Sequence, residues 1–198
     1  MEIPAPPAAQ GLSEPVNVAV SGDLGGVDPH NRFPGHDYLG GRQSAASGLD
    51  AEKDVLFVIL TSHGSPDGLA IKAGRLQQIL TPAQLSAMLA KTGVRHKVVV
   101  ISACYSGVFI PRLANPDVLV ITAADANHSS FGCQDKARWT YFGDAFFNVA
   151  LRHPVSLTDA FLDARSLVRK RELREHFEPS NPQMAGGANV LPLLIGRH

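Results

Sequence analysis

Three short segments of this chain, residues 55–60, 97–101 and 118–122, are apolar at nearly every position. A strand with one solvent-exposed face alternates apolar and polar residues, whereas a strand buried on both faces of a parallel sheet has a continuous apolar run. Helical patterns lie between and after the three segments. This alternation predicts a three-layer α/β/α sandwich with a mostly parallel sheet and helices on both faces.

The helix signals are local. Residues 81–84 read Thr-Pro-Ala-Gln, which supplies an N-cap, a proline in the first turn and a glutamine that completes a capping box. Residues 156–159 read Ser-Leu-Thr-Asp and open a second helix in the same way. Residues 142–151 are typical of a third helix that the following Pro154 ends, and residues 190–195 are expected to return as a last strand.

The front of the chain differs in composition from the rest. Residues 1–49 are rich in glycine and proline, which favour turns over sustained helices. Only residues 16–20 have the pattern of a short strand. We therefore expect 1–49 to be largely irregular and 50–198 to form the compact domain.

Charge and composition exclude several classes of function. Eighteen Lys and Arg balance eighteen Asp and Glu, so a nucleic-acid partner that needs a positive field is not expected. No stretch approaches the roughly 20 apolar residues that span a bilayer, and no signal peptide is visible, so no membrane insertion by this chain is expected. The two cysteines are too few for a disulfide scaffold. Reduced thiols favour the cytosol, although the compartment stays open.

Polar residues follow two of the apolar strands directly. His63 and Gly64 come after residues 55–60, and Cys104 comes after residues 97–101. In an open parallel sheet, ligands bind beyond the carboxyl ends of the strands. Neighbouring strands lie about 4.8 Å apart, so an imidazole and a thiol on adjoining strand ends can approach hydrogen-bonding distance. We predict Cys104 as a nucleophile, His63 as its base, and the Gly64 and Cys104 amides as an oxyanion hole.

Simpler interpretations exist for each residue alone. A single cysteine after an apolar strand is often a small buried hydrophobe, and a His-Gly pair is often only a turn. Cys133 could share a metal with His128, His63 or Cys104, but the chain has no Cys-x-x-Cys or His-x-x-x-His pair. We therefore expect no metal and no cofactor, and we interpret Cys133 as structural.

At these residues the chain resembles the legumain-like peptidases of family C13, which belong to the caspase-like group. The resemblance rests on four ordered blocks: Thr-Ser-His-Gly at 61–64, Ser-Ala-Cys-Tyr-Ser-Gly at 102–107, residues 121–133, and Thr-Tyr-Phe-Gly-Asp at 140–144. Together they cover roughly residues 54–151, in the order and approximate spacing of the family. The Ser-Ala-Cys-Tyr-Ser-Gly block is most similar to bacterial-type members.

The resemblance implies a caspase-like fold for residues 50–198 and roles for particular residues. His63 is implied as general base, Cys104 as the nucleophile that forms an acyl-enzyme, and Gly64 as part of the oxyanion hole. Ser130 and Asp144 are implied to line the pocket for the residue before the scissile bond. Ser102 stands where legumains carry a glutamate in that pocket.

The front end departs from the family pattern. The family places a strand and a long helix before the histidine strand, and these supply an arginine to the pocket and an asparagine beside the histidine. Residues 1–49 show no recognisable copy, so the chain is expected to be truncated or divergent there. With Asp144 unpaired by an arginine, a basic or small polar residue is expected in the pocket as readily as asparagine.

These observations lead to one main hypothesis and two alternatives. The main hypothesis is a cysteine endopeptidase that acts on a peptide or protein substrate without a cofactor. The first alternative is a catalytically silent caspase-like interaction domain. The second is a transamidase-like family member that transfers the acyl group to an amine. Substrate, activation and oligomeric state stay open.

Overall fold

The computed structural model describes residues 17–21, 49–73, 76–132, 139–153 and 156–194. Its centre is a five-stranded sheet in the order β1-β2-β6-β7-β8. The first four strands are parallel, and β8 is antiparallel to β7. The strands are β1 (Asn17–Ser21), β2 (Val55–Thr61), β6 (His96–Ser102), β7 (Val118–Thr122) and β8 (Gln183–Gly186).

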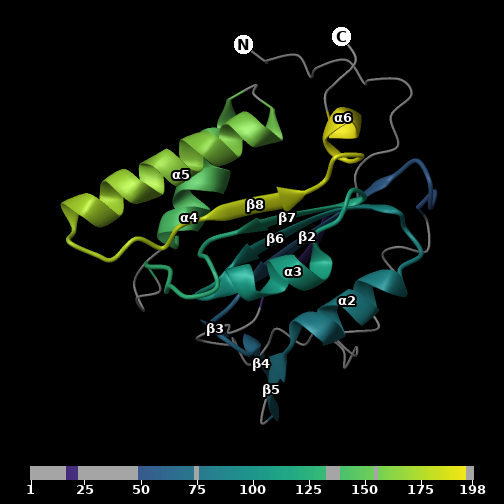
Figure 1. Cartoon of the computed structure of the whole chain (residues 1–198), viewed down its shortest axis with the longest axis horizontal. Helices are drawn as coiled ribbons and strands as arrows, with labels where there is room; N and C mark the ends of the chain where they lie inside the picture. Colours follow the sequence, from purple (N-terminus) through teal and green to yellow (C-terminus); the bar gives the residue numbers. More distant parts are fainter. Residues whose placement is uncertain (1–16, 22–48, 74–75, 133–138, 154–155, 195–198) are drawn as a thin grey trace, which may run out of the picture.

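Helices cover both faces of this sheet (Figure 1). One face carries α2 (Pro82–Ala90) and α3 (Ile110–Leu113), the latter preceded by the 3-10 turn η1 (Ser106–Phe109). The other face carries α4 (Tyr141–Gly143) and α5 (Leu157–Arg174). The α4 helix continues as the π-helix η2 (Asp144–Val149) and the 3-10 turn η3 (Ala150–Arg152), so the predicted helix over 142–151 is confirmed as a helix of changing pitch.

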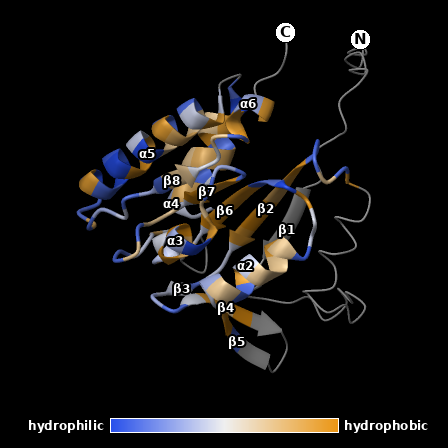
Figure 2. Ribbon diagram, turned by 45° about the vertical axis from the view of Figure 1, so that its right-hand side comes forward, coloured by the Kyte–Doolittle hydropathy of each residue, from blue (hydrophilic) through white to orange (hydrophobic). Residues whose placement is uncertain are grey.

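Two hydrophobic cores lie between these layers. Val99 and Ile101 of β6 point into one core with Leu85 of α2, while Val98 and Val100 point into the other, with α4 and α5. The β6 strand is buried at all seven positions, because its side chains alternate between two covered faces. Figure 2 shows the β2 and β6 strands largely in the hydrophobic colour, whereas α5 mixes hydrophilic and hydrophobic residues. The predicted α/β/α fold class with a mostly parallel sheet is therefore confirmed.

The predicted helix starts are also confirmed. The Gln84 amide donates to Thr81 Oγ1 (3.3 Å) and the Thr81 amide donates to Gln84 Oε1 (2.9 Å), which completes the capping box of α2. At the start of α5, the Asp159 amide donates to Ser156 Oγ (3.1 Å). Each bond satisfies an amide that has no partner within its helix.

The short strand that the pattern of residues 16–20 indicates is present as β1, which lies at the edge of the sheet beside β2. The β1 strand runs parallel to β2, with Asn17 opposite Phe57 and Ser21 opposite Thr61. Its sequence, Asn-Val-Ala-Val-Ser, is short and flanked by turn residues, which makes its strand signal weak in the sequence. The outer edge of β2 is therefore paired and not bare.

The prediction of a last strand over residues 190–195 is wrong. Residues Leu191–Leu194 form the short helix α6, and Val190 is fully buried beneath it. A short apolar run does not by itself distinguish a strand from a buried helical turn. The last strand is β8, whose residues Gln-Met-Ala-Gly lack the β-branched and aromatic side chains that mark strands.

A small second sheet was not anticipated. It consists of β3 (Gly64–Ser65), β4 (Gly68–Ala73) and β5 (Leu76–Leu80), paired antiparallel in sequence order. The turn between β3 and β4 contains Pro66 and Asp67, a composition that favours a turn. This sheet begins at Gly64, directly after the candidate histidine.

None of the helices in the described ranges combines the length and apolar character needed to cross a membrane.

Candidate active site

The two candidate residues leave the sheet at the same edge. The β2 and β6 strands are parallel neighbours, with Thr61 opposite Ser102, and the Ser62 amide extends the pairing by donating to the Ser102 carbonyl (3.4 Å). His63 and Cys104 each follow this last pair by two residues. The prediction that their strands are neighbours is confirmed.

The loop of His63 rests directly on the loop of Cys104. A Cβ atom on Gly64 would lie 1.9 Å from the Cys104 carbonyl oxygen, so the two backbones are in van der Waals contact at this point. Only glycine allows this approach. The histidine loop and the cysteine loop are thus held at a fixed separation by backbone atoms.

The small sheet supports the histidine from the other side. The Ala70 amide of β4 donates to the His63 carbonyl (2.9 Å), and Ser62 Oγ donates to the Ala70 carbonyl (2.6 Å). The first bond holds the backbone of His63, and the second holds the residue before it to the same β4 residue. The unanticipated small sheet therefore positions a predicted site residue.

The sulfur of Cys104 contacts the predicted pocket residue Ser130. The Ser130 amide donates to Cys104 Sγ (3.3 Å), the thiol reaches the Ser130 carbonyl (3.3 Å), and Ser130 Oγ lies 3.8 Å from the sulfur. Cys104 is half-buried and Ser130 is buried. An amide that donates to sulfur is a suitable partner for a thiolate, because the negatively charged form accepts the stronger hydrogen bond.

The residues after Cys104 pack against the same segment of the chain that contains Ser130. The Tyr105 amide donates to the His128 carbonyl (2.9 Å), and Ser106 Oγ accepts from the Ala124 amide (3.1 Å). A Cβ on Gly107 would lie 2.5 Å from the Ala126 nitrogen. Residues 104–107 are therefore packed, one after another, against residues 124–130.

Ser102 is the last residue of β6, two positions before Cys104. The residue is 5% exposed, and its hydroxyl hydrogen-bonds Thr140 Oγ1 at 3.1 Å. Thr140 is also the N-cap of α4, since its Oγ1 accepts from the Gly143 amide (3.0 Å). Ser102 thus links the cysteine strand to the start of α4.

The expectation that Asp144 is unpaired is wrong. Its carboxylate accepts from Asn148 Nδ2 (2.8 Å) and forms an ion pair with Arg171 of α5 (3.8 Å). Arg171 also lies 3.8 Å above the Tyr141 ring. The sequence could not show this pairing, because α5 brings Arg171 over α4 only when both pack on the sheet. The argument for a cationic residue in the pocket therefore loses its basis.

Glu175 completes the contact between α4 and α5. It accepts hydrogen bonds from the Tyr141 hydroxyl and from Arg171 Nε (3.1 Å). The hydrogen bond from Tyr141 is the main cause that lowers the pKa of Glu175 below its usual value near 4.5, with burial opposing it and the arginines adding to it. Burial, then the bond to Glu175, raises the pKa of Tyr141.

Replacing Glu175 by glutamine is expected to make the free energy of unfolding fall less steeply as the pH decreases from 7 to 3. A carboxyl whose folded pKa is lowered contributes stability above its unfolded pKa, near 4.5, and loses it as the pH falls through the lower folded value. Urea unfolding of Glu175→Gln and the parent between pH 7 and pH 3 measures this difference. Glu178→Gln, a substitution at an exposed glutamate, is the matched control and is expected to follow the parent curve. Parallel curves for Glu175→Gln and the parent would contradict the prediction.

Sequence reasoning did not single out Asp125 and Asn181. Asp125 Oδ1 lies 2.7 Å from His128 Nδ1, and Asn181 Nδ2 donates to Asp125 Oδ2 (3.0 Å). The Asp-x-x-His spacing in residues 125–128 was the available signal. Asn181 precedes β8 and is far away in the sequence, so only the fold brings it here. Cys133 lies outside the described residues.

Within the part of the chain that the structure describes, no group of three or more histidine, cysteine, aspartate or glutamate side chains is placed to hold a metal ion.

The structure is an α/β protein whose candidate histidine and cysteine follow neighbouring strand ends. In a comparison with protein families, the model of the peptidase C13 family matches residues 39–188. The match covers well over half of the chain, and the chain belongs to this family. The family resemblance inferred from the four blocks is confirmed.

A search of solved structures finds similarity to caspase-1 from Spodoptera frugiperda, with a TM-score of 0.47 and 17% sequence identity. The similar region covers 75% of this chain and 66% of that structure's chain, slightly under two thirds of its length. The search of curated proteins finds no match.

Proposed function

We propose that this protein is a cysteine endopeptidase in which Cys104 is the nucleophile and His63 is the general base. One observation carries the proposal: the two loops leave neighbouring parallel strands at the same level and touch through Gly64 and the Cys104 carbonyl. Membership of the peptidase C13 family supports the same chemistry. Both residues follow strand carboxyl ends, the usual place for a site in an open sheet.

The first half-reaction forms an acyl-enzyme. His63 takes the thiol proton, and Cys104 Sγ attacks the carbonyl carbon of the scissile peptide bond. The Gly64 and Cys104 amides stabilise the oxyanion that forms. The C–N bond then breaks, the protonated His63 gives its proton to the leaving amine, and a thioester to Cys104 remains.

The second half-reaction releases the acid product. His63 takes a proton from a water molecule, whose oxygen attacks the thioester carbonyl. The C–S bond breaks, and the proton returns to the sulfur. No step in this sequence requires a cofactor.

Three further residues have supporting roles in the proposal. Ser130 forms the wall beside the sulfur through its amide and hydroxyl. Ser102 and Asp144 are proposed to border the pocket for the residue before the scissile bond, with Ser102 bonded to Thr140 and the Asp144 charge shared with Arg171.

A labelling experiment tests the proposal without knowledge of the substrate. A panel of peptidyl acyloxymethyl ketones, applied to the Cys133→Ala variant, is expected to add one label to Cys104, detected by intact-mass and peptide-mass spectrometry. Labelling of the His63→Ala variant in the same background is expected to fall at least about 100-fold, because the base is lost. A Cys104 thiol that reacts no faster than free cysteine would indicate a silent interaction domain.

The cleavage products distinguish hydrolysis from acyl transfer. A peptide library cleaved by the parent protein is expected to yield free carboxylates, with or without an added primary amine. Amide products formed at the expense of carboxylates would instead indicate the transamidase-like alternative.

A further inference from the structure

The residue that follows the nucleophile has an unusual backbone. Tyr105 has φ 55° and ψ 16°, in the left-handed region that residues with a Cβ seldom adopt. Such a conformation is strained for a residue with a Cβ and persists only where the surrounding structure enforces it. It also sets the direction in which the chain runs from Cys104 into η1. The structure must therefore contain the groups that hold Tyr105.

The first of these groups is the backbone of His128. The Tyr105 amide donates to the His128 carbonyl at 2.9 Å, and Tyr105 is the N-cap of η1 with no side-chain hydrogen bond of its own there. The turn that contains His128 is in turn organised by Asp125. The Asp125 carboxylate contacts His128 Nδ1 at 2.7 and 2.8 Å and accepts from the Asn127 amide at 2.8 Å.

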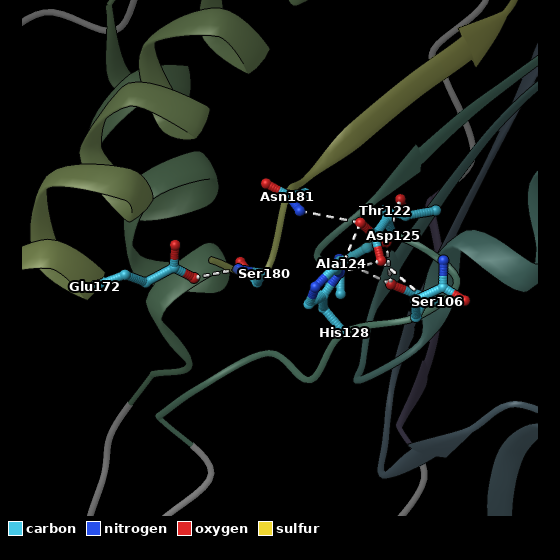
Figure 3. A network of polar contacts seen from close by, with 9 residues as sticks. Ser106, Thr122, Ala124, Asp125, His128, Glu172, Ser180 and Asn181 are labelled. Carbon is cyan, nitrogen blue, oxygen red and sulfur yellow. Dashed lines mark hydrogen bonds and ion pairs between the residues drawn. The ribbon is translucent and has the colours of Figure 1, made fainter. Parts of the chain in front are cut away.

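Asp125 is itself fixed from a distant part of the chain (Figure 3). Asn181 Nδ2 donates to its carboxylate, and the Asp125 amide donates to the Ser180 carbonyl (2.9 Å). The Ser180 amide then donates to Glu172 Oε1 (3.0 Å) on α5, where the glutamate is 1% exposed. The chain of contacts runs from a buried residue of α5 to the residue after the nucleophile.

Asp125 acts here as an anion. Burial alone would raise the pKa of Asp125, but the hydrogen bonds from the Asn127 amide, His128 and Asn181 outweigh it and lower that pKa. Because a carboxylate only accepts, His128 Nδ1 carries the proton that points to it. In this pair, His128 donates and Asp125 accepts. The bond therefore fixes the orientation of the imidazole and the position of the His128 backbone carbonyl.

We propose that Asp125 is a positioning residue for the nucleophile, which acts through the His128 turn to hold Tyr105 in its left-handed conformation and so to present the Cys104 sulfur. This proposal rests on the proposed function only in naming Cys104 as the nucleophile. Asp125 is not assigned any contact with substrate.

A rescue experiment tests this role, with every variant made in the Cys133→Ala background. Asp125→Ala is expected to lower the alkylation rate of Cys104 by iodoacetamide about tenfold, and kcat by a similar factor with little change in KM. Tyr105→Gly alone is expected to have a small effect, because glycine adopts positive φ without strain. The double variant Asp125→Ala/Tyr105→Gly is expected to recover most of the alkylation rate, which a general loss of packing would not allow.

Controls and outcomes separate this proposal from the proposed function. Asp163→Ala, at an exposed carboxylate on α5, is the matched control and is expected to leave the alkylation rate of Cys104 and kcat unchanged. If Asp125→Ala fails to fold, Asn181→Ala removes one bond to the same carboxylate and is expected to show a smaller loss, again rescued by Tyr105→Gly. An unchanged alkylation rate of Cys104 in Asp125→Ala and Asn181→Ala would overturn the positioning role. A loss of that rate that Tyr105→Gly does not rescue would overturn it as well. A parent protein that cleaves no peptide, with the alkylation pattern intact, would overturn only the peptidase assignment.

Discussion

Replacing Cys104 by alanine is expected to abolish peptide cleavage, with a loss of at least about 10⁴-fold in kcat. The reason is that the proposed acyl-enzyme needs a sulfur that the alanine methyl group cannot replace. The variant is expected to fold normally, because Cys104 is half-buried and, among the described residues, its sulfur hydrogen-bonds to Ser130 alone. Cleavage of a fluorogenic peptide identified from the library digest measures the effect.

Two companion variants make this result specific. His63→Ala is expected to lose nearly all activity, because the thiol then lacks its base, while Cys133→Ala is expected to retain most of it. Near-parent unfolding midpoints would show that the losses are chemical and not structural. Retained turnover in Cys104→Ala would remove the thiol mechanism altogether.

Replacing Gly64 by alanine is expected to have the largest combined effect on stability and activity. The new Cβ would lie 1.9 Å from the Cys104 carbonyl oxygen, a backbone atom that cannot rotate away. One of the two loops must move by more than 1 Å, which we expect to cost about 3 kcal/mol of folding free energy. Since this contact sets the separation of His63 from Cys104, kcat/KM is expected to fall about 100-fold.

Gly93→Ala is the matched control for this substitution. Gly93 lies just after α2 with φ +71°, and a Cβ there would meet nothing within 4 Å. We expect it to lose about 1 kcal/mol through backbone strain and to leave kcat/KM unchanged. Urea unfolding and steady-state kinetics on both variants give the comparison. Equal losses of activity in the two variants would show that the Gly64 contact does not control the site.

The parts of the fold that the sequence predicted are those with strong local signals. Residues 97–101 predicted a doubly buried strand because every position except the first is apolar, and β6 is buried throughout. The helix starts at Thr81 and Ser156 were predictable because capping uses residues within three positions of each other. Placing His63 and Cys104 at neighbouring strand ends needed only these strands and the rule for parallel sheets.

The errors fall where local signals are weak or where a partner is distant. The β8 strand has the sequence Gln-Met-Ala-Gly, and among the described strands its partner is β7, so its assignment depends on β7 being there. The apolar residues 191–194 form a helix although they fit a strand equally well. The sequence shows no partner for Asp144, because Arg171 lies 27 positions away and meets it only when α5 packs beside α4.

The sequence by itself determined the α/β class, the strands that form the centre of the sheet, the C13 family resemblance and the two residues expected to carry the chemistry. Apolar periodicity, caps and short motifs are properties of neighbouring residues, so they can be read without a structure. The tertiary structure alone decided how those residues are held. It brings Gly64 against the Cys104 carbonyl and the Ser130 amide to the Cys104 sulfur. It also forms the series of hydrogen bonds from Asn181 through Asp125 to Tyr105. These contacts join residues up to 56 positions apart, and their geometry exists only after the sheet has aligned its strands.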